Sequence, residues 1–147
     1  MDLPDCIDNL FEKFISLTQK KKSIYLSSAS LFHQGVMLWG DHPSLSFAAI
    51  VSALETIISF DVKPKSGEIK SSFKAFLKRY TNPSDDFDEF STKIYNKRCK
   101  ILHGGHLFLG EVKSGEIGSF DIVEDDDFRR SVIRICRIAL VNWLLSQ

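Results

Sequence analysis

Residues 44–59 read SLSFAAIVSALETIIS, and this stretch decides the class of fold. Its apolar side chains recur at three- and four-residue steps, which is the spacing of one face of an α-helix. The other face carries small residues and a single acid, Glu55. We therefore expect a core helix that Ser44 caps at its N-terminus. The side chains expected in the core are Phe47, Ile50, Val51, Leu54, Ile57 and Ile58.

The same helical period continues on both sides of this stretch. Phe11, Ile69 and Leu102 are among the side chains that it places on inward faces. Short connections between consecutive amphipathic helices are typical of an up-and-down bundle. We therefore expect an all-α up-and-down bundle of about five to six helices. The further expected helices cover residues 5–20, 23–39, 68–80, 86–103 and 125–145.

Residues 105–124 do not follow the helical period. Two apolar arms flank a Ser-Gly turn, and this pattern fits either a short β-hairpin or an ordered loop. Three consecutive acids, Asp125–Asp127, follow the second arm. Acids favour the positive N-terminal end of a helix, so we expect them to cap the last one.

Length and composition exclude several classes of protein. The chain has 147 residues, 44% of them apolar, which predicts one domain spanning residues 1–147. Nineteen basic and nineteen acidic residues give no net charge, so any anion-binding surface has to be local. Three separated cysteines indicate neither a disulfide framework nor a zinc site. The N-terminal residues do not resemble a signal peptide, and we see no apolar run of membrane-spanning length. We expect a cytoplasmic protein.

Residues 95–105 carry the candidate chemistry. Arg98 and His103 are five residues apart, or about 140° around an ideal helix, so spacing alone does not put them on one face. They can converge because arginine is long and His103 lies in the last turn. Two glycines follow the histidine, which ends the helix and leaves the ring accessible. An arginine and a histidine on one helix are also commonly structural or solvated.

This pair of residue types suits cleavage of a phosphodiester. Arginine presents a charged fork of donors to phosphate oxygens, and histidine is the usual general acid or base. An RNA 2′-hydroxyl can serve as the internal nucleophile without a metal. We find no Asp, Glu or His cluster at metal-ligand spacing nearby, and we expect no cofactor.

The segment resembles the signature of the HEPN superfamily. Its pattern, Tyr-x-x-Arg-x-x-Ile-x-His-Gly-Gly over residues 95–105, is most similar to the ApeA-like HEPN group. A second match is Ala53-Leu54-Glu55, which resembles an earlier core helix of that group. Together the matches and the helix order around them cover residues 23–145.

The resemblance implies a helical homodimer in which both Arg/His motifs line one cleft, acting as a metal-independent endoribonuclease on single-stranded RNA. It implies a role in defence or as a toxin, with an antitoxin or a larger parent protein as a possible partner. By position, Arg98 would bind the scissile phosphate and His103 would transfer protons. Glu55 would orient Arg98 or another site residue, and Tyr95 would support the site or stack on a base.

One departure from the pattern keeps an alternative open. Cys99 follows the arginine, where active members often carry asparagine, aspartate or histidine. This favours a non-catalytic HEPN module that binds RNA or a nucleotide, dimerises or docks a partner. A helical interaction domain with a chance motif is a third interpretation, and it predicts that Arg98 and His103 do not approach each other.

Three lysines form a stripe beside the motif. Lys93, Lys97 and Lys100 are spaced to lie along one side of the helix. Such a stripe can bind the RNA backbone, with an affinity that falls as salt rises. A solvated helix face explains the same lysines equally well. The same alternative holds for a second strip of arginines on the last helix, namely Arg129, Arg130, Arg134 and Arg137.

Overall fold

The structure, a computed structural model, describes residues 7–65, 67–81, 87–108, 111 and 119–147. Throughout these residues the regular secondary structure is helical and no strand is present, so the expected all-α up-and-down bundle is confirmed. The helices are α1 (Ile7–Ser16), α2 (Gln19–Met37), α3 (Pro43–Asp61), α4 (Ile69–Tyr80), α5 (Phe87–Gly104) and α6 (Ser119–Leu145).

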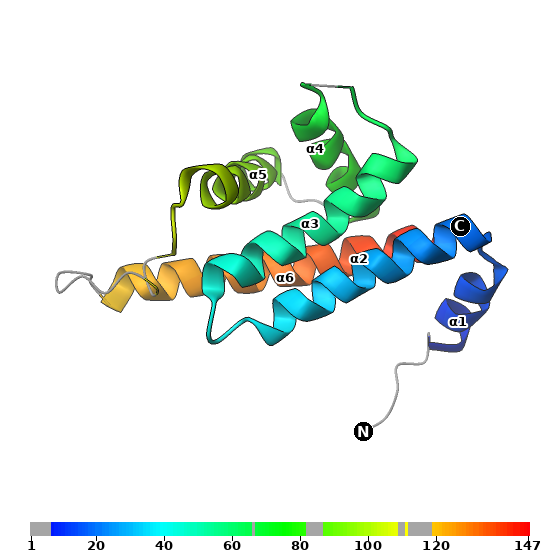
Figure 1. Ribbon diagram of the computed structural model, residues 1–147, viewed down its shortest axis with the longest axis horizontal. Helices are drawn as coiled ribbons and strands as arrows, with labels where there is room; N and C mark the ends of the chain where they lie inside the picture. The colour runs from blue at the N-terminus through cyan, green and yellow to red at the C-terminus, as the bar shows by residue number, and fades with distance from the viewer. Residues whose placement is uncertain (1–6, 66, 82–86, 109–110, 112–118) are drawn as a thin grey trace.

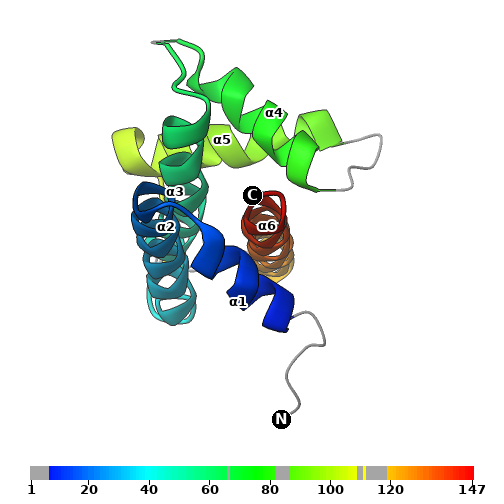
Figure 2. The same ribbon diagram turned by 90° about the vertical axis from the view of Figure 1, so that its right-hand side faces the viewer.

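Three long helices form the body of the molecule. Helices α2, α3 and α6 run along its long axis (Figure 1) and are seen end-on in Figure 2. Helices α4 and α5 cover one side of this body, where α5 contacts α3 and α4 contacts both α5 and α6. Helix α1 lies on the opposite side, against α6. The central position of α3 explains why its sequence is the most apolar.

Helix α3 supplies the centre of the core. All six side chains expected on its inner face are buried. The expected N-cap was wrong, because the helix begins two residues earlier, with His42 as the cap and Pro43 in the first turn. Proline suits this position because its missing N–H would have no partner there. Ser44 is instead fully buried inside the first turn.

Helix α2 approaches α3 closely through small side chains. The Ser28 hydroxyl donates to the Ala53 carbonyl at 2.6 Å, and the Ser46 hydroxyl donates to the Gly35 carbonyl at 2.6 Å. A Cβ atom at Gly35 would lie 2.6 Å from Cγ1 of Ile50. The two backbones therefore pack at a distance that only small residues allow.

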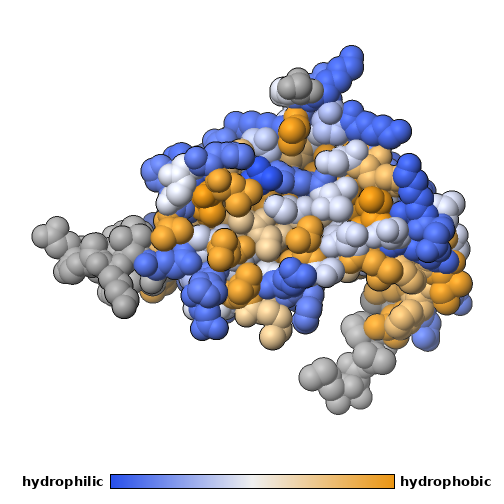
Figure 3. Space-filling view, viewed as in Figure 1, coloured by the Kyte–Doolittle hydropathy of each residue, from blue (hydrophilic) through white to orange (hydrophobic). Residues whose placement is uncertain are grey.

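Three expected core side chains are exposed instead. Phe11 is 58% exposed, Ile69 is 44% exposed and Leu102 is 44% exposed. The helical period places these residues on apolar faces, but the faces are wider than the neighbouring helices cover. Figure 3 shows the apolar surface that this leaves over α1, at the lower right of the view.

The last helix starts earlier than expected. Helix α6 begins at Ser119, so Asp125–Asp127 lie more than a turn inside it and do not cap its N-terminus. Asp126 instead pairs with Arg129 and Arg130 at 3.5 and 2.9 Å, one turn further along. Of the expected hairpin or loop, residues 105–108 have no regular structure. Residues 109–110 and 112–118 lie outside the described part of the chain.

Helix α3 is, by length and composition alone, long and apolar enough to cross a membrane, contrary to our expectation that no segment is. More than half of its most apolar window, 56%, is buried inside the bundle. A core helix that other helices surround meets the same criterion.

Candidate active site

Arg98 on α5 reaches Glu55 on α3. Its Nη2 donates to Oε2 of Glu55 at 2.5 Å, and the two side chains are only 19% and 14% exposed. The expected pairing of these two residues is therefore confirmed. A charge-assisted hydrogen bond between partly buried groups fixes both side chains more firmly than a surface ion pair does.

The spacing of α5 explains why Arg98 faces α3. Ile94 and Ile101 are both buried. Because they lie seven residues apart, or about two turns, they belong to one apolar seam along the helix. Arg98 lies between them on the same seam, four residues after the first and three before the second. Its side chain therefore enters the contact between α5 and α3, where Glu55 is the acid that α3 presents.

Burial and charge act in opposite directions on Glu55. Burial raises the pKa of the Glu55 carboxyl, while the charge and hydrogen bond of Arg98, and then the charge of His103, lower it. Oε1 of Glu55 and Nε of Arg98 are buried, and neither has a hydrogen-bond partner among the described residues. The acid is thus an electrostatic partner of both Arg98 and His103, and Glu55 and Arg98 each keep one buried polar atom without a hydrogen-bond partner among the described residues.

His103 lies in the last turn of α5 with its side chain exposed. Gly105 adopts a left-handed conformation with φ of 65°, which glycine tolerates without steric cost. The chain then turns back, and the His106 N–H donates to the Lys100 carbonyl at 3.2 Å. The described residues contain no hydrogen bond between Arg98 and His103. What links the two residues is Glu55, because the charges of both lower the pKa of its carboxyl against the effect of burial.

Tyr95 and Cys99 complete this cluster on α5. The Tyr95 ring packs against Phe73 of α4, with 5.8 Å between ring centroids. Burial raises the pKa of Tyr95, and the neighbouring Cys99 thiol adds to this rise, as does the charge of Glu55. Tyr95 is therefore within the electrostatic influence of the Glu55–Arg98 pair, although the charge of Arg98 lowers its pKa, and the nearby Cys99 is a half-buried free thiol.

The three lysines of the stripe have different environments. Nζ of Lys93 lies 3.9 Å from Glu124 and 4.8 Å from the centre of the Phe128 ring. Nζ of Lys97 lies 3.9 Å from Asp125 and 4.2 Å from the centre of the Phe108 ring. Lys100 is exposed and forms no ion pair within the described ranges. Acids of α6 thus offset much of the charge of the stripe.

The sequence did not predict the residues that anchor the chain after the motif. The ring over which Lys97 lies is Phe108, which is buried against Phe47 of α3. The Phe108 N–H donates to the Ser44 hydroxyl at 2.8 Å. The Glu111 carboxylate accepts from the Ser44 N–H at 3.0 Å and from the Ser44 hydroxyl. No local sequence signal predicts these contacts, because the partners are more than sixty residues apart.

Arg129 is the second residue whose role the sequence did not indicate. Its guanidinium lies over the Trp39 ring at 3.8 Å and donates to the Trp39 carbonyl at 2.6 Å. Burial lowers the pKa of Arg129, and the charges of Asp126, Glu111 and Asp125 oppose this. Arg129 therefore joins α6 to the turn that follows α2, and it does not contribute to an exposed arginine strip.

No group of three or more histidine, cysteine or acidic side chains within the described residues is arranged to hold a metal ion.

Comparisons of the chain with family models, curated proteins and solved structures give no match.

Proposed function

We propose that this protein is a metal-independent endoribonuclease of the HEPN type, acting on single-stranded RNA in a defence or toxin-like role. The single observation that carries the proposal is the Arg98–Glu55 pair, on a helix whose last turn carries an exposed His103. The pair holds a guanidinium in one orientation in the second half of α5. A positioned guanidinium and an accessible imidazole are the two groups that cleavage through the 2′-hydroxyl needs.

The proposed reaction assigns each group one task. The RNA 2′-oxygen attacks phosphorus and loses its proton to an imidazole, while Arg98 stabilises the charge on the phosphate oxygens. The 5′-oxygen leaves with a proton from a second imidazole. The products are a 2′,3′-cyclic phosphate and a free 5′-hydroxyl. In a homodimer, His103 and the partner's His103 supply the two imidazoles.

A second candidate is a non-catalytic HEPN module that binds RNA or a partner protein. The observation that favours it is the same Arg98–Glu55 bond, because a phosphate has to compete with a carboxylate that already holds the guanidinium at 2.5 Å. The partial neutralisation of Lys93 and Lys97 by acids of α6 points in the same direction. This candidate predicts RNA binding without new RNA ends.

The test is cleavage of a labelled single-stranded RNA in the presence of EDTA. We expect wild-type protein to generate 2′,3′-cyclic phosphate ends. His103→Ala should reduce the rate by about a hundredfold or more, since a general acid or base contributes roughly that much. The His103 side chain is exposed, so this variant should fold normally. His33→Ala, which removes an exposed histidine on α2, is the matched control and should cleave like wild type.

The Arg98 variants need a check of folding. Arg98→Ala leaves the Glu55 carboxylate partly buried without its partner, so Arg98→Lys is measured beside it and circular dichroism follows the helix content. Arg137→Ala removes an exposed arginine on α6 and serves as the control. If wild type and His103→Ala both bind RNA and neither cleaves it, the nuclease proposal is wrong and the non-catalytic binding module takes its place.

A further inference from the structure

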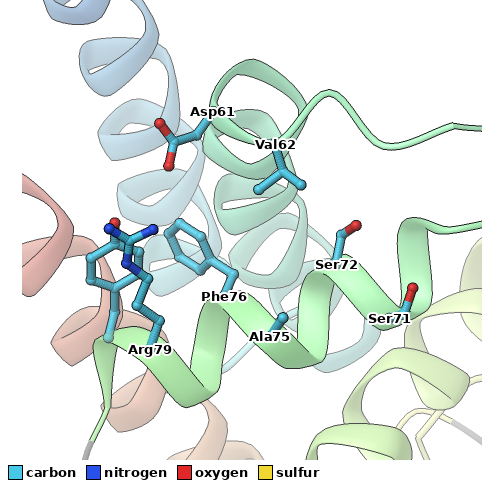
Figure 4. Close-up of a pocket in the computed structure, with 8 residues that line it drawn as sticks. Asp61, Val62, Ser71, Ser72, Ala75, Phe76 and Arg79 are labelled. Atoms are coloured by element: carbon cyan, nitrogen blue, oxygen red, sulfur yellow. The ribbon is translucent and has the colours of Figure 1, made fainter.

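A pocket between the C-terminal end of α3 and helix α4 lies apart from the Arg98 cluster. It encloses about 310 Å³ and shares no lining residue with that cluster. Figure 4 shows Val62 on one wall, with Ala75 and Phe76 on the facing wall. This volume lies at the lower end of the range of small-molecule sites, so the slot between these residues could hold a ligand of about the size of a nucleobase.

Two side chains of opposite charge border this slot without pairing. Asp61 is the last residue of α3, and Arg79 lies in the last turn of α4 (Figure 4). Neither forms an ion pair with any side chain in the described part of the protein. The Arg79 guanidinium lies over the Tyr80 ring at 5.2 Å, which holds it beside the slot. A carboxylate and a guanidinium are therefore both available to a ligand between them.

We propose that this pocket binds guanine, presented as an unpaired base of single-stranded RNA. Guanine offers two adjacent N–H donors at its Watson–Crick edge, and a carboxylate such as that of Asp61 accepts both. It offers the acceptors O6 and N7 on the neighbouring edge, which arginine contacts in a bidentate manner. Adenine, cytosine and uracil lack this combination of a two-donor edge and a two-acceptor edge. Val62, which is 50% exposed, would contact a face of the base, and Phe76, which is buried, would offer only the small part of its ring that lines the pocket.

The surroundings of the pocket suit a nucleic acid more than a neutral ligand. Residues 61–80 contain six basic and two acidic residues, although the chain has no net charge. In Figure 3, hydrophilic side chains project from the upper edge near α4 and the connection before it, with apolar side chains between them. The exposed lysines in this region include Lys63, Lys65 and Lys78. An RNA backbone that follows the pocket would meet these charges.

The inference rests on the proposed function in one respect only, namely that the guanine belongs to an RNA. Recognition of guanine at α4 does not require cleavage at α5. The two proposals can therefore fail separately. A protein that cleaves RNA but does not bind guanine overturns the pocket proposal alone, whereas guanine binding by an inert protein overturns only the nuclease.

The experiment is isothermal titration calorimetry of the whole chain with nucleoside monophosphates. We expect GMP to bind and AMP, CMP and UMP to bind at least about tenfold more weakly. IMP lacks the exocyclic amine that Asp61 would accept from, and 7-deaza-GMP lacks the N7 that Arg79 would donate to. Each is expected to lose about tenfold in affinity relative to GMP. Equal binding of all nucleotides, or no binding of GMP, overturns the proposal.

Two pairs of variants assign the contacts. Asp61→Asn should remove the preference for GMP over IMP, and Arg79→Gln should remove the preference for GMP over 7-deaza-GMP. Both side chains are exposed, so the fold should be preserved. Asp41→Asn and Arg137→Gln change exposed residues elsewhere and should leave the preferences intact. A guanine-containing RNA should compete with GMP better than an all-adenine RNA does. Competition by neither RNA overturns the RNA source and leaves a free guanine nucleotide as the ligand.

Discussion

Glu55 is the residue on which the candidate site depends. It is the single acid on the small-residue face of α3, and it is the partner of Arg98. Burial raises the pKa of its carboxyl more than Arg98 and His103 lower it. Forming the ion pair removes two charges from water, which offsets much of its stabilising effect. Its main effect is therefore to fix the direction of the guanidinium, and its contribution to net stability is small.

The pKa of Glu55 predicts a pH dependence of stability. Because its folded-state pKa is raised, the native protein binds the Glu55 proton more tightly than the unfolded chain does. The contribution of Glu55 to the free energy of unfolding should therefore be complete below the ordinary value of 4.5 and fall as pH rises through the folded value. The measurement is urea denaturation of wild type and Glu55→Gln across this range.

The result is the difference in the free energy of unfolding between wild type and Glu55→Gln at each pH. Other carboxyl groups titrate in both, so only the contribution of Glu55 changes between them. Glu12→Gln removes an exposed carboxyl on α1 and is the control. A wild-type minus Glu55→Gln difference that is constant with pH, or that rises with it, would show that the pKa is not raised.

At the scale of elements, the contact between α2 and α3 sets the geometry of the core helix that carries Glu55. Gly35 lies where α2 meets α3, and a Cβ there would approach the Ser46 carbonyl oxygen at 2.9 Å as well as Ile50. Backbone atoms cannot move aside as the end of a flexible side chain can. The close approach therefore requires glycine at this position.

Gly35→Ala tests this contact. Alanine gains up to about 1 kcal/mol of helix propensity over glycine in a helix interior. Overpacking against α3 costs about 1 to 3 kcal/mol, so we expect net destabilisation in thermal unfolding. Gly40→Ala is the matched control, since nothing lies within 4 Å of a Cβ at Gly40. Greater stability of Gly35→Ala than of wild type would mean that the helices separate easily.

At the scale of the whole molecule, the end of α5 exposes apolar side chains around His103. Leu102 is 44% exposed and Leu107 is 48% exposed, although both flank the candidate catalytic histidine. A second copy of the chain that covers them would bring two His103 side chains together. The proposed homodimer therefore has apolar side chains at the place where its shared site would form.

Leu107→Glu should weaken this dimer. A charge in a dry contact costs far more than the same charge in water, so sedimentation velocity should show the variant as a monomer with unchanged helix content. Its RNA cleavage should fall together with the dimer. Met37→Glu changes a side chain that is 69% exposed on α2 and should remain dimeric. A dimer that survives Leu107→Glu places the interface elsewhere, and a monomeric wild type contradicts the composite site.

The sequence by itself determined the helical class and the inner face of α3. Both follow from local spacing, because a helical period fixes which residues share a face. The pairing of Glu55 with Arg98 was suggested by the family resemblance, and the structure shows that the buried Ile94 and Ile101 lie on either side of Arg98 on the inner face of α5. Only the tertiary structure decided which apolar faces are covered, and it left Phe11, Ile69 and Leu102 exposed.

The tertiary structure also decided how the ends of helices are satisfied. Glu111 supplies the carboxylate at the first turn of α3, where the local sequence pointed to Ser44 as the cap. Arg129 is buried over Trp39, although its spacing grouped it with exposed arginines. The physical reason is the same in both cases. Helical periodicity is a property of neighbouring residues, whereas burial, capping and pairing across the fold depend on residues that only folding brings together.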